Sequence, residues 1–185
     1  MSEFIKKYIE NFNLSFSKKN IDQIQNFCEI VKNTIQSKNN IFICGNGGSA
    51  ANSLHMANDF NLVLIKKKKY KSYVDSLCSN QAIISCIAND FGYKNIFSEQ
   101  IKIRAKKNDL VIFLSGSGNS ENIINGIKLS LKNKLKVLSI LGFDGGKAKK
   151  LSQNFFHLEI NDMQYSEDAQ NIINHICAKW LYKKL

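Results

Sequence analysis

Residues 41–60 read IFICGNGGSAANSLHMANDF, an apolar run followed by glycines and then by a helical pattern. The run from Ile41 to Cys44 is typical of a buried strand, because strands of a parallel sheet are covered on both faces. The glycines that follow predict a turn, and a helix is expected over residues 49–60. A strand that leads through a short turn into a helix indicates an α/β fold.

The same alternation continues to the end of the chain. Strands are expected at residues 74–77, 110–114, 136–141 and 155–160, and helices at 81–88, 121–132, from 147 to 151, and 166–184. This order predicts a parallel sheet flanked by helices, a three-layer, flavodoxin-like α/β fold. A length of 185 residues suits a single domain, with an N-terminal helical segment (1–38) added to an α/β core (39–185).

The amino-acid composition limits which partners and which cellular compartment we expect for the protein. The formal charge is +11, yet Arg104 is the only arginine. Proteins that read nucleic acids usually rely on arginine as well, so we favour a solvated lysine-rich surface that attracts anionic ligands and expect no nucleic-acid partner. The apolar runs are far too short to span a membrane, and Met1–Lys7 has no apolar signal segment. Five cysteines without a CxxC pair favour a reduced, cytoplasmic protein.

Two loops have the chemistry of anion-binding sites. Residues 45–49 (GNGGS) and 115–120 (SGSGNS) each follow a predicted strand and precede a predicted helix. Ligands of open α/β sheets bind beyond the carboxyl ends of the strands, where glycines admit a ligand to the backbone and helix N-termini attract anions. The alternative is a pair of ordinary turns with N-cap serines. The nucleotide-binding patterns GK[ST] and GxGxxG are lacking.

Histidines and carboxylates follow the first loop and occupy the last helix. His55 and Asp59 lie one turn apart on one helix face and suit a divalent metal or acid–base chemistry, unless they form only a surface hydrogen bond. Glu167 and His175 lie eight residues apart, about 12 Å along a straight helix. To bind the same ion, they require a bent helix; otherwise they serve different parts of the site or different subunits. His157, in an apolar strand, is interpreted as structural.

Five segments occur together in this chain: CGNGGSAANSLHMAND (44–59), ANDFGY (88–93), SGSGNS (115–120), GFDGGK (142–147) and the pattern EDAQ (167–170) with His175. In combination they resemble the phosphoheptose isomerase family, whose fold is the sugar-isomerase (SIS) domain. The resemblance implies a homotetramer, a zinc ion, and isomerisation of sedoheptulose 7-phosphate to D-glycero-D-manno-heptose 7-phosphate through an enediol.

Site residues follow from the resemblance. The implied substrate-binding residues are Asn46, Gly47, Gly48, Ser49, Asn89, Asp90, Ser115, Gly116, Ser117, Ser120 and Glu167. The implied metal ligands are His55, Asp59, Glu167 and His175, and the implied catalytic residues are Asp59, Glu167 and His175.

Two residues depart from the family pattern. Asp59 stands where most members carry glutamate, and Glu167 stands where many carry glutamine, so either carboxylate is a candidate base. Two alternatives are a SIS protein that binds a phosphosugar or a replication initiator without catalysis, and an isomerase of another sugar phosphate.

Overall fold

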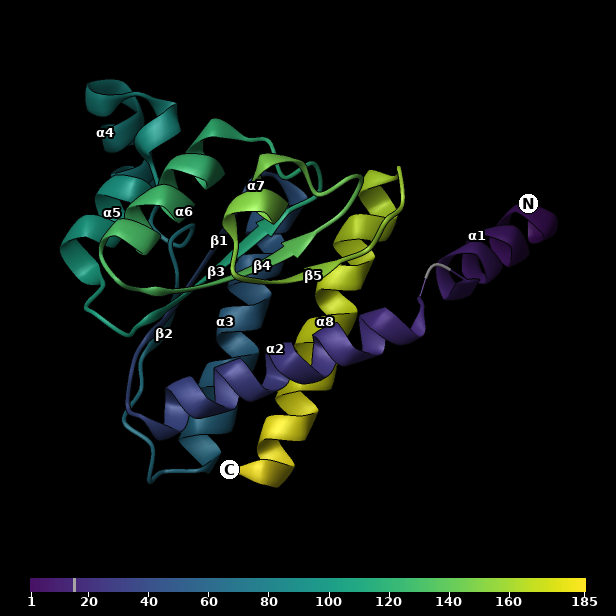
Figure 1. Cartoon of the computed structure of the whole chain (residues 1–185), viewed down its shortest axis with the longest axis horizontal. Coiled ribbons are helices and arrows are strands. Elements are labelled where there is room, and N and C mark those ends of the chain that lie inside the picture. Colours follow the sequence, from purple (N-terminus) through teal and green to yellow (C-terminus); the bar gives the residue numbers. More distant parts are fainter. Residues whose placement is uncertain (15) are drawn as a thin grey trace.

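A computed structural model describes residues 1–14 and 16–185, with a five-stranded parallel sheet at their centre (Figure 1). The strands are β1 (Ile41–Gly45), β2 (Val74–Ser76), β3 (Leu110–Ser115), β4 (Lys136–Leu141) and β5 (Asn154–His157). Their order in the sheet is β2-β1-β3-β4-β5. This is the flavodoxin-like order, and the predicted fold class is confirmed.

The strand order changes direction between β1 and β3. Ile41 pairs with Leu110 and Gly45 with Leu114, so these two strands end side by side at the same edge of the sheet. The chain leaves β1 toward one side of the sheet and leaves β3 toward the other, which opens a crevice beyond their carboxyl ends. Both glycine-rich loops lie at this crevice.

Helices cover both faces of the sheet (Figure 1). The helices on one face are α2 (Lys18–Gln36), α3 (Gly48–Lys66) and α8 (Met163–Lys184). The other face carries α4 (Gln81–Phe91), α5 (Ser98–Arg104), α6 (Glu121–Lys132) and α7 (Gly146–Leu151), with a short 3-10 helix at Tyr93–Asn95. Helix α1 (Ser2–Leu14) projects from the body beside the start of α8. Within the described residues, none of the helices has the length and hydropathy of a bilayer span.

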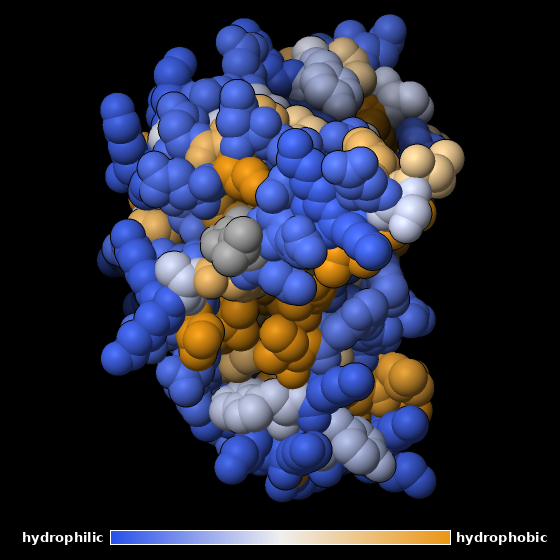
Figure 2. Space-filling view, turned by 90° about the vertical axis from the view of Figure 1, so that its right-hand side faces the viewer, coloured by the Kyte–Doolittle hydropathy of each residue, from blue (hydrophilic) through white to orange (hydrophobic). Residues whose placement is uncertain are grey.

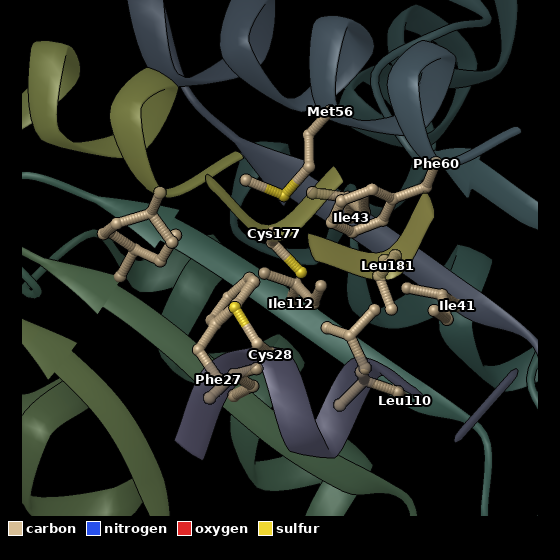
Figure 3. Close-up of a cluster of buried hydrophobic side chains, with 14 of the residues drawn as sticks. Phe27, Cys28, Ile41, Ile43, Met56, Phe60, Leu110, Ile112, Cys177 and Leu181 are labelled. Atoms are coloured by element: carbon tan, nitrogen blue, oxygen red, sulfur yellow. The ribbon is translucent and has the colours of Figure 1, made fainter. Parts of the chain in front are cut away.

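Each face of the sheet has its own apolar core. Alternate residues of a strand point to opposite faces, so Ile41 and Ile43 join the core under α2, α3 and α8, whereas Phe42 and Cys44 join the other. Figure 3 shows the first core, where Phe27, Phe60 and Leu181 come from three different helices. Residues of α8 are thereby packed against α3, which fixes the two helices that carry the predicted catalytic residues.

Several elements differ from the sequence prediction; among them, α3 continues to Lys66 instead of ending at residue 60. Helix α5 was not predicted, because seven residues are too few for helical periodicity to be recognised. Helix α8 begins at Met163 instead of residue 166, since the side chain of Asp162 accepts a hydrogen bond from the Tyr165 N–H at 2.9 Å and caps the helix. Strand β5 ends at His157, because the carbonyl of Ile160 binds the N–H of Phe143 in a loop.

Candidate active site

The loop after β1 presents backbone groups at the start of α3. Gly47 has φ of 56° and is the N-cap residue, so no side chain covers the first N–H groups of the helix. The hydroxyl of Ser49 is buried and accepts a hydrogen bond from Gln170 Nε2 at 2.9 Å. Helix α8 therefore holds this loop from the side.

The loop after β3 presents hydroxyls. The oxygens of Ser115 and Ser117 accept bonds from the N–H groups of Gly118 at 3.1 Å and Asn119 at 3.3 Å. Their hydroxyl hydrogens remain available for a ligand. Gly118 has φ of 64°, and a Cβ there would collide with the carbonyl oxygen of Gly145, so the loop is closely packed against the segment that begins α7.

A cavity of about 250 Å³ lies between the two loops. Leu114 and Met163 line it together with nine predicted substrate-binding residues: Asn46, Gly47, Gly48, Ser49, Ser115, Gly116, Ser117, Ser120 and the half-buried Glu167. The carboxylate of Glu167 lies directly against Gly48, where any Cβ would overlap it. The cavity thus combines N–H and hydroxyl donors for an anion with one carboxylate.

His55, Asp59 and His175 form a second group. Asp59 Oδ2 lies 3.4 Å from Nε2 of His55 and 3.8 Å from Nε2 of His175. One potential ligand atom from each residue lies within 4.8 Å of the other two. Both histidine side chains are about half exposed, which leaves room for water or substrate. Two imidazoles and one carboxylate with an open side suit a catalytic zinc-type site, so the donor set fits a divalent metal.

Helix α8 keeps Glu167 apart from this group. The helix runs without interruption from Met163 to Lys184, and Glu167 lies eight residues, or about 12 Å of helix rise, before His175. Glu167 is not one of the three grouped ligands and belongs to the cavity between the loops. Within one chain, the predicted catalytic and metal-binding residues therefore fall into two parts.

Asn89 and Asp90 lie elsewhere. Both are exposed near the end of α4, where Asn89 Nδ2 donates to Asp90 Oδ1 at 2.8 Å, and neither lines the cavity. The nearby Tyr93 does reach the site, because its hydroxyl donates to Asn46 Oδ1 at 3.0 Å. Of these three residues, Tyr93 is the one that connects α4 and the 3-10 helix to the first loop.

Sequence reasoning missed Asn52 and Asn122, whose contacts with predicted site segments hold the site together. The side-chain amides of Asn46 and Asn122 exchange two hydrogen bonds, of 2.9 and 2.8 Å, which link the first loop to α6. Asn52 donates to Gln170 Oε1 at 2.9 Å and connects α3 to α8. Helical spacing assigns these residues to their helices, but only tertiary packing reveals which amides meet.

His157 lies outside both parts of the site. It is 6% exposed in β5, and its Nε2 lies 3.0 Å from the carbonyl oxygen of Phe143. Burial lowers the pKa of His157. These contacts fit the structural role expected for it.

Comparisons with known proteins agree with this architecture. The SIS domain family matches residues 4–142. A phosphoheptose isomerase of Clostridium acetobutylicum is 34% identical over 165 residues, covering 89% of this chain and 84% of that relative. One from Buchnera aphidicola subsp. Acyrthosiphon pisum (strain Tuc7) is 33% identical over 187 residues, covering 100% of this chain and 92% of its own.

The fold agrees as well. The solved structure of phosphoheptose isomerase GmhA from Neisseria gonorrhoeae superposes with a TM-score of 0.86 at 20% sequence identity, covering 97% of both chains. From the sequence relatives and the SIS match, this chain belongs to the phosphoheptose isomerase family of SIS-domain proteins.

Proposed function

We propose that this chain is an aldose–ketose isomerase that converts sedoheptulose 7-phosphate into D-glycero-D-manno-heptose 7-phosphate. Its relatives of 33–34% identity carry the name phosphoheptose isomerase. The observation that carries the proposal is the cavity at the crevice, where two anion-binding loops share one space with the Glu167 carboxylate. A phosphorylated sugar needs both features, an anion site to hold it and a carboxylate to move a proton.

The phosphate group would occupy the serine loop. Ser115, Ser117 and Ser120 supply hydroxyl donors at the start of α6, whose N-terminus favours an anion. Asn46, Gly47, Gly48 and Ser49 would face the sugar from the opposite wall, with Gly116 leaving the backbone accessible. Binding energy from the remote phosphate then orients the reacting carbons. Asn89 and Asp90 would act from outside this cavity, where a neighbouring copy of the chain can approach them.

Glu167 is the proposed base. It removes a proton from C1 of the ketose while the carbonyl oxygen at C2 gains a proton, which gives an enediol. Returning a proton to C2 and removing one from the C1 hydroxyl yields the aldehyde, so no proton is gained or lost overall. His175 is also a proposed metal ligand, and a ring nitrogen bound to a metal cannot carry this proton, so water in the open site is the proposed carrier of the proton between the two oxygens.

The proposed metal is zinc, held by His55, Asp59 and His175. A bound zinc ion polarises a carbonyl oxygen as a Lewis acid. Asp59 suits the role of ligand because one of its oxygens lies near both imidazoles. Glu167 was also predicted as a ligand, but its carboxylate faces the cavity, and we assign it to proton transfer instead.

A homo-oligomer, most simply a tetramer, would join the two parts of the site. Glu167 and His175 are about 12 Å apart along the axis of one helix, which is why we propose that residues of different copies meet at one substrate. Apolar side chains suited to such contacts gather across the face from which α1 projects (Figure 2). On α1, Phe4, Ile5 and Ile9 are 49–70% exposed. Exposed apolar surface of this kind marks protein contacts.

Three measurements test the proposal. Among a panel of C5 to C7 sugar phosphates, sedoheptulose 7-phosphate should be isomerised most rapidly. Binding of a sugar phosphate without turnover would instead indicate a regulatory phosphosugar-binding protein. Metal analysis of tag-free protein should find zinc, and unchanged activity after chelation would refute a catalytic metal. Sedimentation should give a tetramer, and a monomer at micromolar concentration would refute the shared site.

Mixing inactive subunits tests the shared site directly. Glu167→Gln and His175→Gln variants should each lose activity, and hybrids formed by co-expression should recover part of it, because some sites then combine intact residues from two copies. Hybrids as inactive as the separate variants would contradict a site built from two subunits.

The compartment is part of the proposal. All five cysteines are free thiols, four of them buried (Cys28, Cys44, Cys78 and Cys177). Free thiols persist in a reducing compartment, so we propose the cytoplasm.

A further inference from the structure

Asp59 has a third neighbour besides the two histidines. Asn174 lies on α8, is 1% exposed, and donates a hydrogen bond from Nδ2 to Asp59 Oδ2 at 2.8 Å. The same oxygen is the one that lies near Nε2 of His55 and of His175. Three groups from two helices therefore converge on a single carboxylate oxygen, and Asn174 makes the shortest of these contacts.

Core packing alone gives no reason for an amide at position 174. The Oδ1 atom of Asn174 is buried and has no hydrogen-bond partner in the described part of the chain. A buried, unpaired acceptor destabilises the folded state, and leucine, of similar size, would fill the same space without that cost. The amide does provide the bond to Asp59, which leucine could not make.

The geometry also shows why the carboxylate needs such a bond. Asp59 projects from α3, whereas His175 projects from α8, so the distance between them depends on how the Asp59 side chain rotates. Asn174 directly precedes His175 on α8. Its bond connects the Asp59 carboxylate to the same helix that carries the second imidazole.

We propose that Asn174 is a positioning residue that holds Oδ2 of Asp59 between His55 and His175. This inference rests on the proposed function, in which those three residues bind a divalent metal. Groups that hydrogen-bond to a metal ligand fix its orientation, and their loss typically weakens metal binding about 10–100-fold. Asn174 fills this role for Asp59.

The test compares Asn174→Leu with a matched control, Asn171→Leu. Asn171 lies three residues earlier on α8 and also has a buried, unpaired Oδ1, but it has no bond to Asp59 among the described contacts. Metal-free proteins are titrated with Co²⁺, and the visible absorption of the bound ion is recorded. Asn174→Leu should bind Co²⁺ about 10–100-fold more weakly with an altered spectrum, while its melting temperature stays equal to or above that of the wild type. Asn171→Leu should bind Co²⁺ as the wild type does.

Two results would overturn the proposal. One is wild-type Co²⁺ affinity and spectrum in Asn174→Leu, and the other is an equal loss of affinity in Asn171→Leu, which would indicate general loosening of α8. If the wild-type protein takes up no Co²⁺, the metal site of the proposed function fails. In that case, crystal structures of the wild type and of Asn174→Leu test the positioning role of Asn174 without a metal. A displaced Asp59 carboxylate in the variant supports the positioning role, and an unmoved one refutes it.

Discussion

Gly48→Ala is the substitution that most directly tests the role of Glu167. Gly48 is the first residue of α3, and a Cβ at this position would overlap the Glu167 carboxyl group. Carbon atoms in contact pack at about 3.5–4.0 Å, so the carboxylate must retreat by more than about 1 Å. The end of a glutamate side chain is flexible, and the backbone has no need to move.

The effect on stability should be small. Alanine is favoured over glycine by about 0.8–1.0 kcal/mol in a helix interior, which is an upper bound for the first helical residue. Moving Glu167 off its preferred rotamer costs about 0.5–1.5 kcal/mol. These two contributions nearly cancel, so we expect the free energy of unfolding, measured by thermal denaturation, to lie within about 1 kcal/mol of the wild-type value.

The effect on turnover should be large. Misplacing a catalytic group by about 1 Å can reduce the rate about 10²-fold. Steady-state assays with sedoheptulose 7-phosphate should therefore give a lower kcat for Gly48→Ala at nearly unchanged stability. The control is the double variant Gly48→Ala/Glu167→Ala, which should match Glu167→Ala alone, because the clash then has no partner. If Gly48→Ala turns over as fast as the wild type, the position of Glu167 does not matter and our reasoning fails.

Three further predictions concern the loops and the core. Ser117→Ala and Ser120→Ala should each weaken phosphosugar binding, by about 1.5–3 kcal/mol for each lost charge-assisted bond; wild-type affinity in calorimetry would remove the phosphate assignment. Gly118→Ala should destabilise the fold by more than about 1 kcal/mol, since it adds left-handed strain to a collision with the Gly145 carbonyl; chemical denaturation with an unchanged midpoint would contradict this packing. Burial lowers the pKa of His157, so the unfolded chain binds more protons. The contribution of His157 to stability should be present above its ordinary pKa of about 6.5 and be lost as pH falls through the lowered pKa of the folded state. The melting temperature of His157→Gln should therefore change less with pH than that of the wild type. The same pH dependence in both proteins would refute the assignment.

The sequence by itself determined the fold class and most of the elements. Strands such as Leu110–Ser115 are apolar up to their last residue, and the glycine-rich turns after them mark where helices begin. These signals are local, because periodicity of two or of 3.6 residues is written in neighbouring positions. The predicted helix over 121–132 and strand over 136–141 coincide with α6 and β4 for the same reason.

The tertiary structure decided how the site residues are grouped. Sequence spacing could pair His55 with Asp59 on one helix, but the approach of His175 depends on how α8 packs against α3. The same packing brings Asn174 to Asp59 across 115 positions of the chain. It also leaves Glu167 and His175 in different parts of the site, because both stand on one uninterrupted helix, eight residues apart. Contacts between distant segments depend on the shapes of two packed surfaces, and no local pattern of residues records them.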